Sequence, residues 1–332
     1  HAQRMTAELN GTVVDESGGV IPGADVVLIN EASGSERRSV TNADGFFAFA
    51  AVPAATYTIQ ISLQGFSTYE VTEIPLNAGD SRSLRDLPLA VAAMAETVSV
   101  TAEVQLTPLN SGEKSTTLTS EVIEDIPLVS SSAAELLKVL PGMVPRNNTG
   151  DAKNRPGFSG EVIGINGNGE YDGAGGDNQS AIGNYSANGG RQDTLDITID
   201  GAPGADPGCN CATSVNPNTE FIQEFKVLTS SFSAEFSKGP NSITVVSKSG
   251  GRDFHGSAFL YFRDHHLNSN DWQANQVGKE RVETQFVYPG FTFGGPLSIG
   301  GFNENKDKVF FFVGFEYYKQ QLPTGFQRTW VP

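Results

Sequence analysis

The chain has 332 residues, a formal net charge of −16 and a hydrophobic content of 38%, which is enough for two compact domains with real cores. The acidic balance and the lack of clustered Lys and Arg exclude a phosphate-binding surface, so nucleic acid is not an expected partner. No run of roughly 18 apolar residues occurs, so the sequence predicts no transmembrane helix and no intact signal peptide. The chain contains 37 Gly, 17 Pro and 21 Phe but only 3 Met. This composition favours short strands with many turns, and hence a mainly β protein.

The chain start and the two cysteines both suggest export. His1-Ala2-Gln3 is similar to the remains of a signal cleavage site with the mature chain beginning near Gln3; the alternative is an arbitrary boundary. Cys209 and Cys211 are too few ligands for a structural zinc site, and we favour a disulfide at a loop tip. We expect no metal site and no cofactor.

Residues 7–91 show short alternating strands separated by Gly, Pro, Asn and Asp, which is typical of a β-sandwich. Along 56–63 the odd positions are apolar and the even ones are polar, so one face of this strand is buried. The predicted strands are Leu9–Val14, Ala24–Asn30, Arg37–Thr41, Phe46–Ala50, Ala55–Leu63, Phe66–Ile74 and Ser83–Leu89.

This region closely resembles the carboxypeptidase regulatory-like domain. The resemblance lies in residues 11–26, 41–49 and 52–57. It implies that the Asp44-Gly45 turn links two strands and that Pro22-Gly23 opens the strand that follows this pair. These residue types do supply the backbone angles of tight turns. No zinc pair or nucleophile with a nearby base can be assembled, so we predict that the chain is not an enzyme.

A linker with one extended stretch, Glu96–Ala102, is expected over residues 92–118, followed by a mixed α/β segment. Capping residues predict a short helix over 119–126 that ends before Pro127, and a second from Ser132 as N-cap, with Leu136, Leu137 and Leu140 on one face. The Gly-, Asn- and Asp-rich stretch 147–188 is interpreted as a binding loop or a mobile one. Ordered structure is expected to return at 196–201, 220–228 and 241–248.

The last part contains aromatic strands with strict alternation. Residues 256–262, 286–293 and 309–317 give roughly three strands of the outer-membrane type, each with one apolar face that could meet lipid.

The middle and last parts together resemble the plug and early barrel of TonB-dependent receptors of the Oar-like branch. The motifs lie, in order, at Ile126-Pro127, Leu136–Gly142, Gly189–Arg191, Asp200-Gly201, Ile222–Val227, Ser233–Phe236, Val245–Gly250 and Phe254–Gly256. The implied fold is mainly β: an N-terminal transthyretin- or immunoglobulin-like β-sandwich, an α+β plug domain, and the first antiparallel strands of an outer-membrane β-barrel. The expected divisions are 1–6 (post-signal N-terminus), 7–91 (sandwich), 92–118 (linker), 119–250 (plug) and 251–332 (incomplete barrel).

Within this resemblance, the stretch Glu96-Thr97-Val98-Ser99-Val100-Thr101-Ala102 is similar to a Ton box, the peptide that such receptors present to TonB in the periplasm. An extended peptide can add a strand to a partner's sheet and then bear a pulling force. A plain linker strand is the alternative. The implied partners are TonB with its proton-driven inner-membrane complex, an unknown extracellular substrate and outer-membrane lipid.

Three further groups of residues are candidate sites. Residues 166–172 carry oxygen ligands at alternate positions, but Tyr171 stands where a calcium loop needs Gly, so a solvated loop is preferred. His265 and His266 are expected to point to opposite faces of a strand end and to bind no metal. The resemblance implies ion pairs between plug and barrel, and the candidate residues are Arg191, Asp200, Glu224, Arg252 and Arg263.

The alternative hypothesis is that the chain belongs to a structural or adhesive cell-surface protein that assembles by strand addition. The sequence that follows Pro332 in the reading frame would discriminate the transporter hypothesis from this alternative, because many further amphipathic strands are needed to close a barrel.

Overall fold

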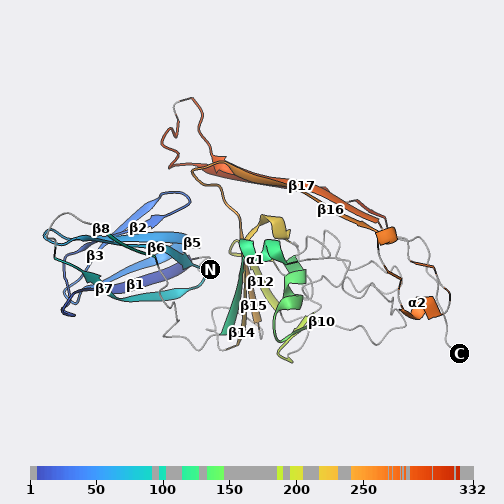
Figure 1. The fold of residues 1–332 in the computed structure, drawn as a ribbon, viewed down its shortest axis with the longest axis horizontal. Helices are drawn as coiled ribbons and strands as arrows, with labels where there is room; N and C mark the ends of the chain where they lie inside the picture. The colour runs from blue at the N-terminus through green and yellow to red at the C-terminus, as the bar shows by residue number, and fades with distance from the viewer. Residues whose placement is uncertain are drawn as a thin grey trace.

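A computed structural model shows three successive parts along the chain (Figure 1). It describes residues 6–91, 97–101, 114–126, 133–145, 185–189, 195–204, 217–230, 241–267, 269–270, 272–276, 278, 280–281, 285–300, 302–317 and 319–321. The candidates Arg191, Cys209 and Cys211 and the loop 166–172 lie outside these residues.

The first part is a β-sandwich, as predicted, and all seven expected strands form. The strands are β1 (Thr6–Asp15), β2 (Asp25–Asn30), β3 (Glu36–Val40), β4 (Phe46–Pro53), β5 (Ala55–Ser62), β6 (Thr68–Leu76) and β7 (Ser81–Leu89). One sheet has the order β4-β1-β7, and the other has the order β3-β2-β5-β6-β8, where β8 is Thr97–Thr101. We call this part, with β8, the N-terminal domain.

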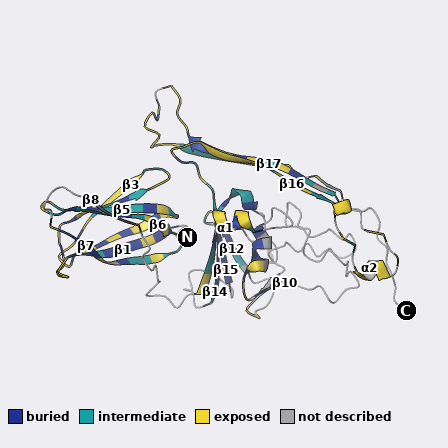
Figure 2. Ribbon diagram, viewed as in Figure 1, coloured by how far each residue is buried: buried dark blue, intermediate teal, exposed yellow. Residues whose placement is uncertain are grey.

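Along the strands, side chains alternate between the two faces of each sheet, and those on the inner faces fill the space between the sheets. Tyr57, Ile59 and Ile61 of β5 are buried, whereas the residues between them are partly exposed. They join a core that includes Leu9, Val26, Leu28, Phe47, Val71, Ile74 and Leu84, and the striped colouring of the strands in Figure 2 follows this pattern. At the predicted Asp44-Gly45 turn, the side-chain oxygen of Asn42 accepts from the backbone N–H groups of Asp44 and Phe46 at 3.0 and 2.9 Å.

The second part is a five-stranded mixed sheet that we call the central sheet, in the order β13-β12-β15-β14-β9. Its strands are β9 (Lys114–Thr119), β12 (Leu195–Ile199), β13 (Ala202–Pro203), β14 (Ile222–Ser230) and β15 (Asn241–Ser247). Strands β10 (Met143–Pro145) and β11 (Tyr185–Ala187) form a separate pair. The strand β9 corrects the predicted linker, because residues 114–118 belong to a sheet. Likewise, Tyr185–Ala187 lies inside the stretch expected to be a loop.

Both predicted helical segments pack on this sheet. The first is α1 (Ser120–Asp125), which ends before Pro127 as expected. The second is not an α-helix but a 3₁₀ helix, η2 (Ala133–Val139). Its Leu136 and Leu137, together with Leu140, are nevertheless buried against Phe225, Val227, Ile243 and Val245. A further 3₁₀ turn, η4 (Thr219–Phe221), leads into β14.

The third part is an antiparallel sheet of barrel type, formed by β16 (His255–Asp264), β17 (Gln285–Pro296), β18 (Phe310–Glu316) and β19 (Lys319–Gln321), which pairs with β17 beyond β18. The 3₁₀ turn η5 (His265–Leu267) and the short helix α2 (Trp272–Gln276) lie between β16 and β17. These strands form a long ribbon that runs above the central sheet in the view of Figure 1.

One face of this ribbon is apolar and exposed. In the registers, Ala258 lies beside Phe291 and Phe291 beside Phe315, while Phe293 lies beside Val313. The four large side chains of this set are 45–54% exposed, and Leu260 and Phe262 are exposed at 63% and 53%. An apolar row of this kind is what the lipid-facing side of an outer-membrane strand requires. Among the described residues, no helix combines the length and the apolar character needed to cross a membrane.

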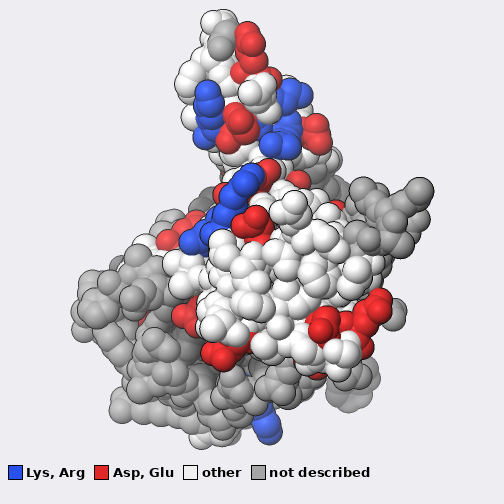
Figure 3. All heavy atoms as spheres, turned by 90° about the vertical axis from the view of Figure 1, so that its left-hand side faces the viewer, with Lys and Arg blue, Asp and Glu red and all other residues white. Residues whose placement is uncertain are grey.

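Figure 3 shows the molecule from the side of the N-terminal domain. Uncharged surface dominates the described part of this face, with Asp and Glu in small separate groups and Lys and Arg mainly towards the top. This part of the surface therefore offers no broad basic area to a phosphate backbone.

Candidate functional site: the junction of the N-terminal domain and the central sheet

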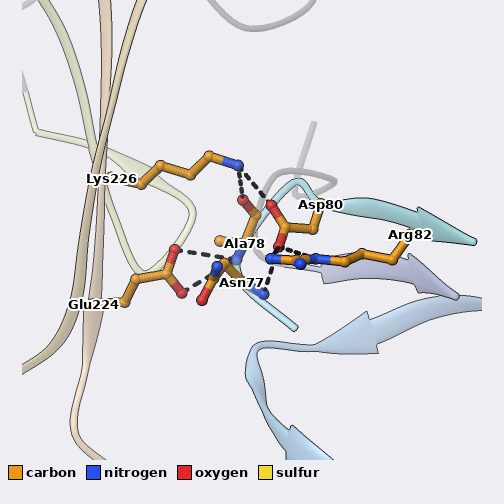
Figure 4. Close-up of polar contacts among 6 residues, drawn as sticks. All are labelled: Asn77, Ala78, Asp80, Arg82, Glu224 and Lys226. Carbon is orange, nitrogen blue, oxygen red and sulfur yellow. Dashed lines mark hydrogen bonds and ion pairs between the residues drawn. The ribbon is translucent and has the colours of Figure 1, made fainter. Parts of the chain in front are cut away.

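Two charged side chains of β14 face the N-terminal domain. Glu224 and Lys226 are two residues apart, so they point to the same side of the strand. Both residues are buried, at 4% and 3% exposure. They meet the turn that joins β6 to β7, residues 77–80, as Figure 4 shows.

The two side chains bind both backbone polar groups of Ala78. The backbone N–H of Ala78 donates to the two carboxylate oxygens of Glu224, at 3.3 and 3.2 Å. The Nζ of Lys226 donates to the carbonyl of Ala78 at 3.0 Å. Because Ala78 is only 2% exposed, these groups would otherwise be buried without partners. We call this arrangement the Ala78 clasp.

Asp80 extends the clasp into a charged cluster. Its Oδ1 lies 3.0 Å from Nζ of Lys226, and its Oδ2 lies 2.8 Å from an Nη atom of Arg82. The same Oδ2 accepts from the backbone N–H of Asn77 at 3.1 Å, and Gly79 takes a φ of +73° in this turn. The local sequence Asn-Ala-Gly-Asp therefore shapes a turn that presents Ala78 to β14.

The pKa values of the two carboxylates of the cluster shift in opposite directions, although burial acts to raise both. Burial raises the pKa of Glu224 from 4.5 to about 7, although the bond from Ala78 and the charge of Lys226 oppose it. Burial also acts to raise the pKa of Asp80, but the charges of Lys226 and Arg82 outweigh it and hold the pKa below its ordinary value. Glu224 is thus the titratable member of the clasp near neutral pH.

Residues 97–101 of the predicted Ton box form β8. Residues Thr97–Thr101 pair in parallel with β6, from Thr68↔Thr97 to Thr72↔Thr101, and β8 is the last strand in the order of its sheet. The next described element along the chain is β9, the last strand of the central sheet, which pairs antiparallel with β14. In that register Thr119 is opposite Glu224 and Thr117 is opposite Lys226.

Three of the candidates for plug–barrel ion pairs, Glu224, Asp200 and Arg252, make hydrogen bonds to groups outside the barrel strands. Glu224 faces the N-terminal domain instead, because its strand face is covered by the 77–80 turn. Asp200 accepts from the backbone N–H and the hydroxyl of Ser247, within the central sheet. Arg252 is exposed, and its backbone N–H donates to Ala32 of the N-terminal domain at 3.0 Å. Arg263 lies on β16.

Other residues, which the sequence did not single out, connect the central part to the barrel strands. The amide of Asn218 donates to Glu316 of β18, and the hydroxyl of Tyr261 of β16 donates to Glu220. Glu220 was visible in the sequence only as the start of a predicted strand. Its role depends on η4, which turns this residue towards β16.

The prediction for His265 and His266 is wrong in its geometry. The two rings lie 3.9 Å apart between centroids, and Nδ1 of His266 lies 2.6 Å from Oδ1 of Asp264. The reason is that both histidines belong to the 3₁₀ turn η5, where neighbouring residues do not alternate between faces.

Comparisons with known families define the two ends of the chain. Residues 8–90 match the carboxypeptidase regulatory-like domain, and residues 246–332 match an outer membrane beta barrel domain. The chain therefore combines a regulatory-like β-sandwich with the beginning of an outer-membrane barrel.

Between and across these domains, the chain is similar to the TonB-dependent transporter Oar of Myxococcus xanthus. The two are 24% identical over 323 residues, which cover 94% of this chain and 26% of Oar. The predicted resemblance to Oar-like TonB-dependent receptors is thereby confirmed. The chain spans about a quarter of the length of this relative.

Solved structures give partial matches. The siderophore receptor PirA from Acinetobacter baumannii is 18% identical with a TM-score of 0.38, over 62% of this chain and 24% of PirA. Catechol 1,2-dioxygenase from Pseudomonas arvilla is 16% identical with a TM-score of 0.23, over 29% of this chain and 56% of the enzyme. Neither likeness is close enough to carry an argument about function.

Proposed function

We propose that the chain is the N-terminal part of an outer-membrane transport protein that is energised by TonB. In this proposal Glu96–Ala102 is the Ton box, the part containing the central sheet is the plug, and the N-terminal domain lies in the periplasm. Substrate binding from outside is signalled through the plug, TonB then pulls the Ton box using the proton gradient, and the plug rearranges to open a path. The chain itself supplies no catalysis.

The position of β8 carries this proposal. An extended strand at a sheet edge has the backbone geometry that a partner needs for strand addition. The strand also directly precedes β9 among the described elements. Force applied to residues 97–101 in the direction of the chain therefore reaches an edge strand of the central sheet once β8 has separated from β6.

An edge strand is a suitable point for such a force. Among the described strands β9 pairs with β14 alone, so it can be peeled away from Lys114 towards Thr119 without breaking the pairs between β14, β15 and β12. Of the six residues of β9 only Leu118 is buried, so little apolar surface resists this separation. The central sheet can thus be altered at its edge while its core stays packed.

Binding of the periplasmic domain of TonB to a peptide covering Glu96–Ala102 tests the assignment. We expect binding that Val98→Pro abolishes, because proline removes a backbone N–H and cannot donate to a strand ladder. Val98→Thr keeps this N–H and is the matched control, with binding close to that of the unaltered peptide. No binding, or equal binding of the proline peptide, would contradict the Ton-box assignment.

A further inference from the structure

The turn at the end of β16 brings three side chains with metal-binding atoms together. Asp264 is the last residue of β16, and His265 and His266 begin η5. One ligand atom from each of these three residues lies within 4.8 Å of the other two. In the part of the chain that the structure describes, no other set of three or more His, Cys, Asp or Glu side chains gathers so closely.

We propose that Asp264, His265 and His266 form a binding site for a zinc ion or a similar divalent transition-metal ion. The sequence predicts no metal here because adjacent residues of a strand point to opposite faces. That reason does not apply to the 3₁₀ turn η5, in which the two rings lie on the same side, 3.9 Å apart between centroids.

The distances within the group suit a single ion. Oδ1 of Asp264 lies 3.5 Å from Nδ1 of His265 and 2.6 Å from Nδ1 of His266. Two ligands that bind one tetrahedral ion at about 2.1 Å are separated by about 3.4 Å. The first distance is close to this value. The second has to widen by about 0.8 Å, and the exposed ring of His266 is free to make this small rotation.

Neighbouring residues hold the carboxylate and the turn in place. Oδ2 of Asp264 accepts from the side-chain amide of Gln285 at 3.1 Å, and these two residues are register partners on β16 and β17. Nη1 of Arg281 donates to the backbone carbonyls of His265 and His266 at 3.3 and 3.2 Å. Hydrogen bonds of this kind orient the ligands of a metal site, so the group is arranged before an ion binds.

The donor set selects the class of metal. Imidazole nitrogens suit zinc, copper and nickel, whereas Ca²⁺ and Mg²⁺ prefer oxygen ligands throughout. Three protein ligands leave the fourth position of a tetrahedral ion open to water or to a donor atom of another molecule. The side chain of His266 is 72% exposed, so an ion can reach the site from solvent.

The site lies at one end of the ribbon, just beyond its apolar face. Asp264 continues the alternate row that contains Leu260 and Phe262, while His255 lies at the other end of β16, next to the central sheet along the chain. The ten residues of β16 are enough to span a membrane, which takes about 9–11. If the N-terminal domain lies in the periplasm, as proposed, the site is on the outer side of the membrane. This placement rests on the proposed function, but the binding of the ion does not.

Zinc binding to the purified chain in detergent tests the site. Cys209→Ser and Cys211→Ser are present throughout and remove the two cysteines as ligands. In equilibrium dialysis we expect one Zn²⁺ per chain, with the affinity lowered at least about tenfold by His266→Ala and by Asp264→Asn. His255→Ala is the matched control, because it removes an exposed histidine from the other end of the same strand, and its affinity should be unchanged.

Nuclear magnetic resonance of the histidine rings gives an independent measure. The chain has four histidines, His1, His255, His265 and His266. We expect Zn²⁺ to shift the ring signals of His265 and His266 together and to leave the other two in place. This measurement keeps all four histidines, so it does not depend on the folding of a variant.

The outcomes separate this proposal from the proposed function. A chain that binds no zinc, zinc binding that His266→Ala leaves unchanged, or shifts at His255 in place of His265 and His266 would each overturn the metal site. TonB takes no part in these measurements, so such a result would leave the Ton-box assignment standing. Failure of the Ton-box peptide to bind TonB would likewise leave the metal site standing.

Discussion

Replacing Glu224 by Gln should strengthen the docking of the N-terminal domain at pH 8. The buried carboxylate has its pKa raised from 4.5 to about 7, so its ionised form is disfavoured in the docked state. At about 1.4 kcal/mol per pKa unit, this shift corresponds to about 3 kcal/mol of docking energy lost when the group is charged. Gln has the same shape, retains an oxygen that accepts from the N–H of Ala78, and carries no charge.

The pH dependence follows from the same shift. The docked state binds the proton of Glu224 more tightly than the undocked state does, so docking of the unaltered protein strengthens as pH falls from about 7 towards 4.5 and weakens as pH rises through 7. The pKa of Asp80 is lowered, so its contribution is lost only below its ordinary value of 3.8. Between pH 5 and 8 the change is therefore due to Glu224, and the Gln variant should not show it.

Hydrogen exchange of the backbone amides in 77–80 measures this docking directly. At pH 8 we expect about a hundredfold greater protection in Glu224→Gln than in the unaltered chain, and only about a fourfold difference at pH 5. Comparing the two proteins at the same pH cancels the intrinsic exchange rate. Glu121→Gln, at an exposed position of α1, is the control. Lower protection in Glu224→Gln at pH 8 would refute the view that burial outweighs the attraction to Lys226.

Three further substitutions test the packing around the junction. Lys226→Ala should weaken docking by about 3–5 kcal/mol, because it leaves the carbonyl of Ala78 unpaired and removes one buried partner of Asp80. Hydrogen exchange of the backbone amides in 77–82 measures this effect, and Lys306→Ala, at an exposed position, should have no effect. Gly11→Ala should lower the stability of the N-terminal domain by about 1–3 kcal/mol, since its Cβ would lie 2.6 Å from the Phe47 ring and 2.7 Å from the Leu84 carbonyl; an unchanged urea midpoint would contradict this close packing. Leu136→Ala should destabilise the central part by about 2–5 kcal/mol in the same measurement, whereas Val139→Ala, at an exposed position of η2, should cost much less.

The sequence predicted those elements whose local pattern is sufficient to define them. The alternation in β5 and the apolar set Leu136, Leu137 and Leu140 each indicate a buried face, and the structure confirms both. β9 was missed because five of its six residues are polar and it gains its strand structure by pairing with β14. A Thr-rich edge strand has no apolar periodicity to detect.

The junction could not be predicted for a related reason. Glu224 and Lys226 are visible as the two charged residues of β14, but their partner Ala78 is 146 and 148 residues away in sequence. No local pattern specifies which surface covers that strand face. The same limit explains why the sequence predicts Glu224 at a barrel wall, and why it predicts an extended strand end where His265 and His266 form a turn.

Site-specific photo-crosslinking to TonB in intact cells tests the central claim most directly. A photoreactive residue is placed at each position from 94 to 104 and, as a control, at Ser81 and Asp86, which are exposed on β7. The account predicts cross-links to TonB concentrated within Glu96–Ala102 and absent at the β7 positions. Cross-links absent from residues 96–102, or equally frequent on β7, would contradict it.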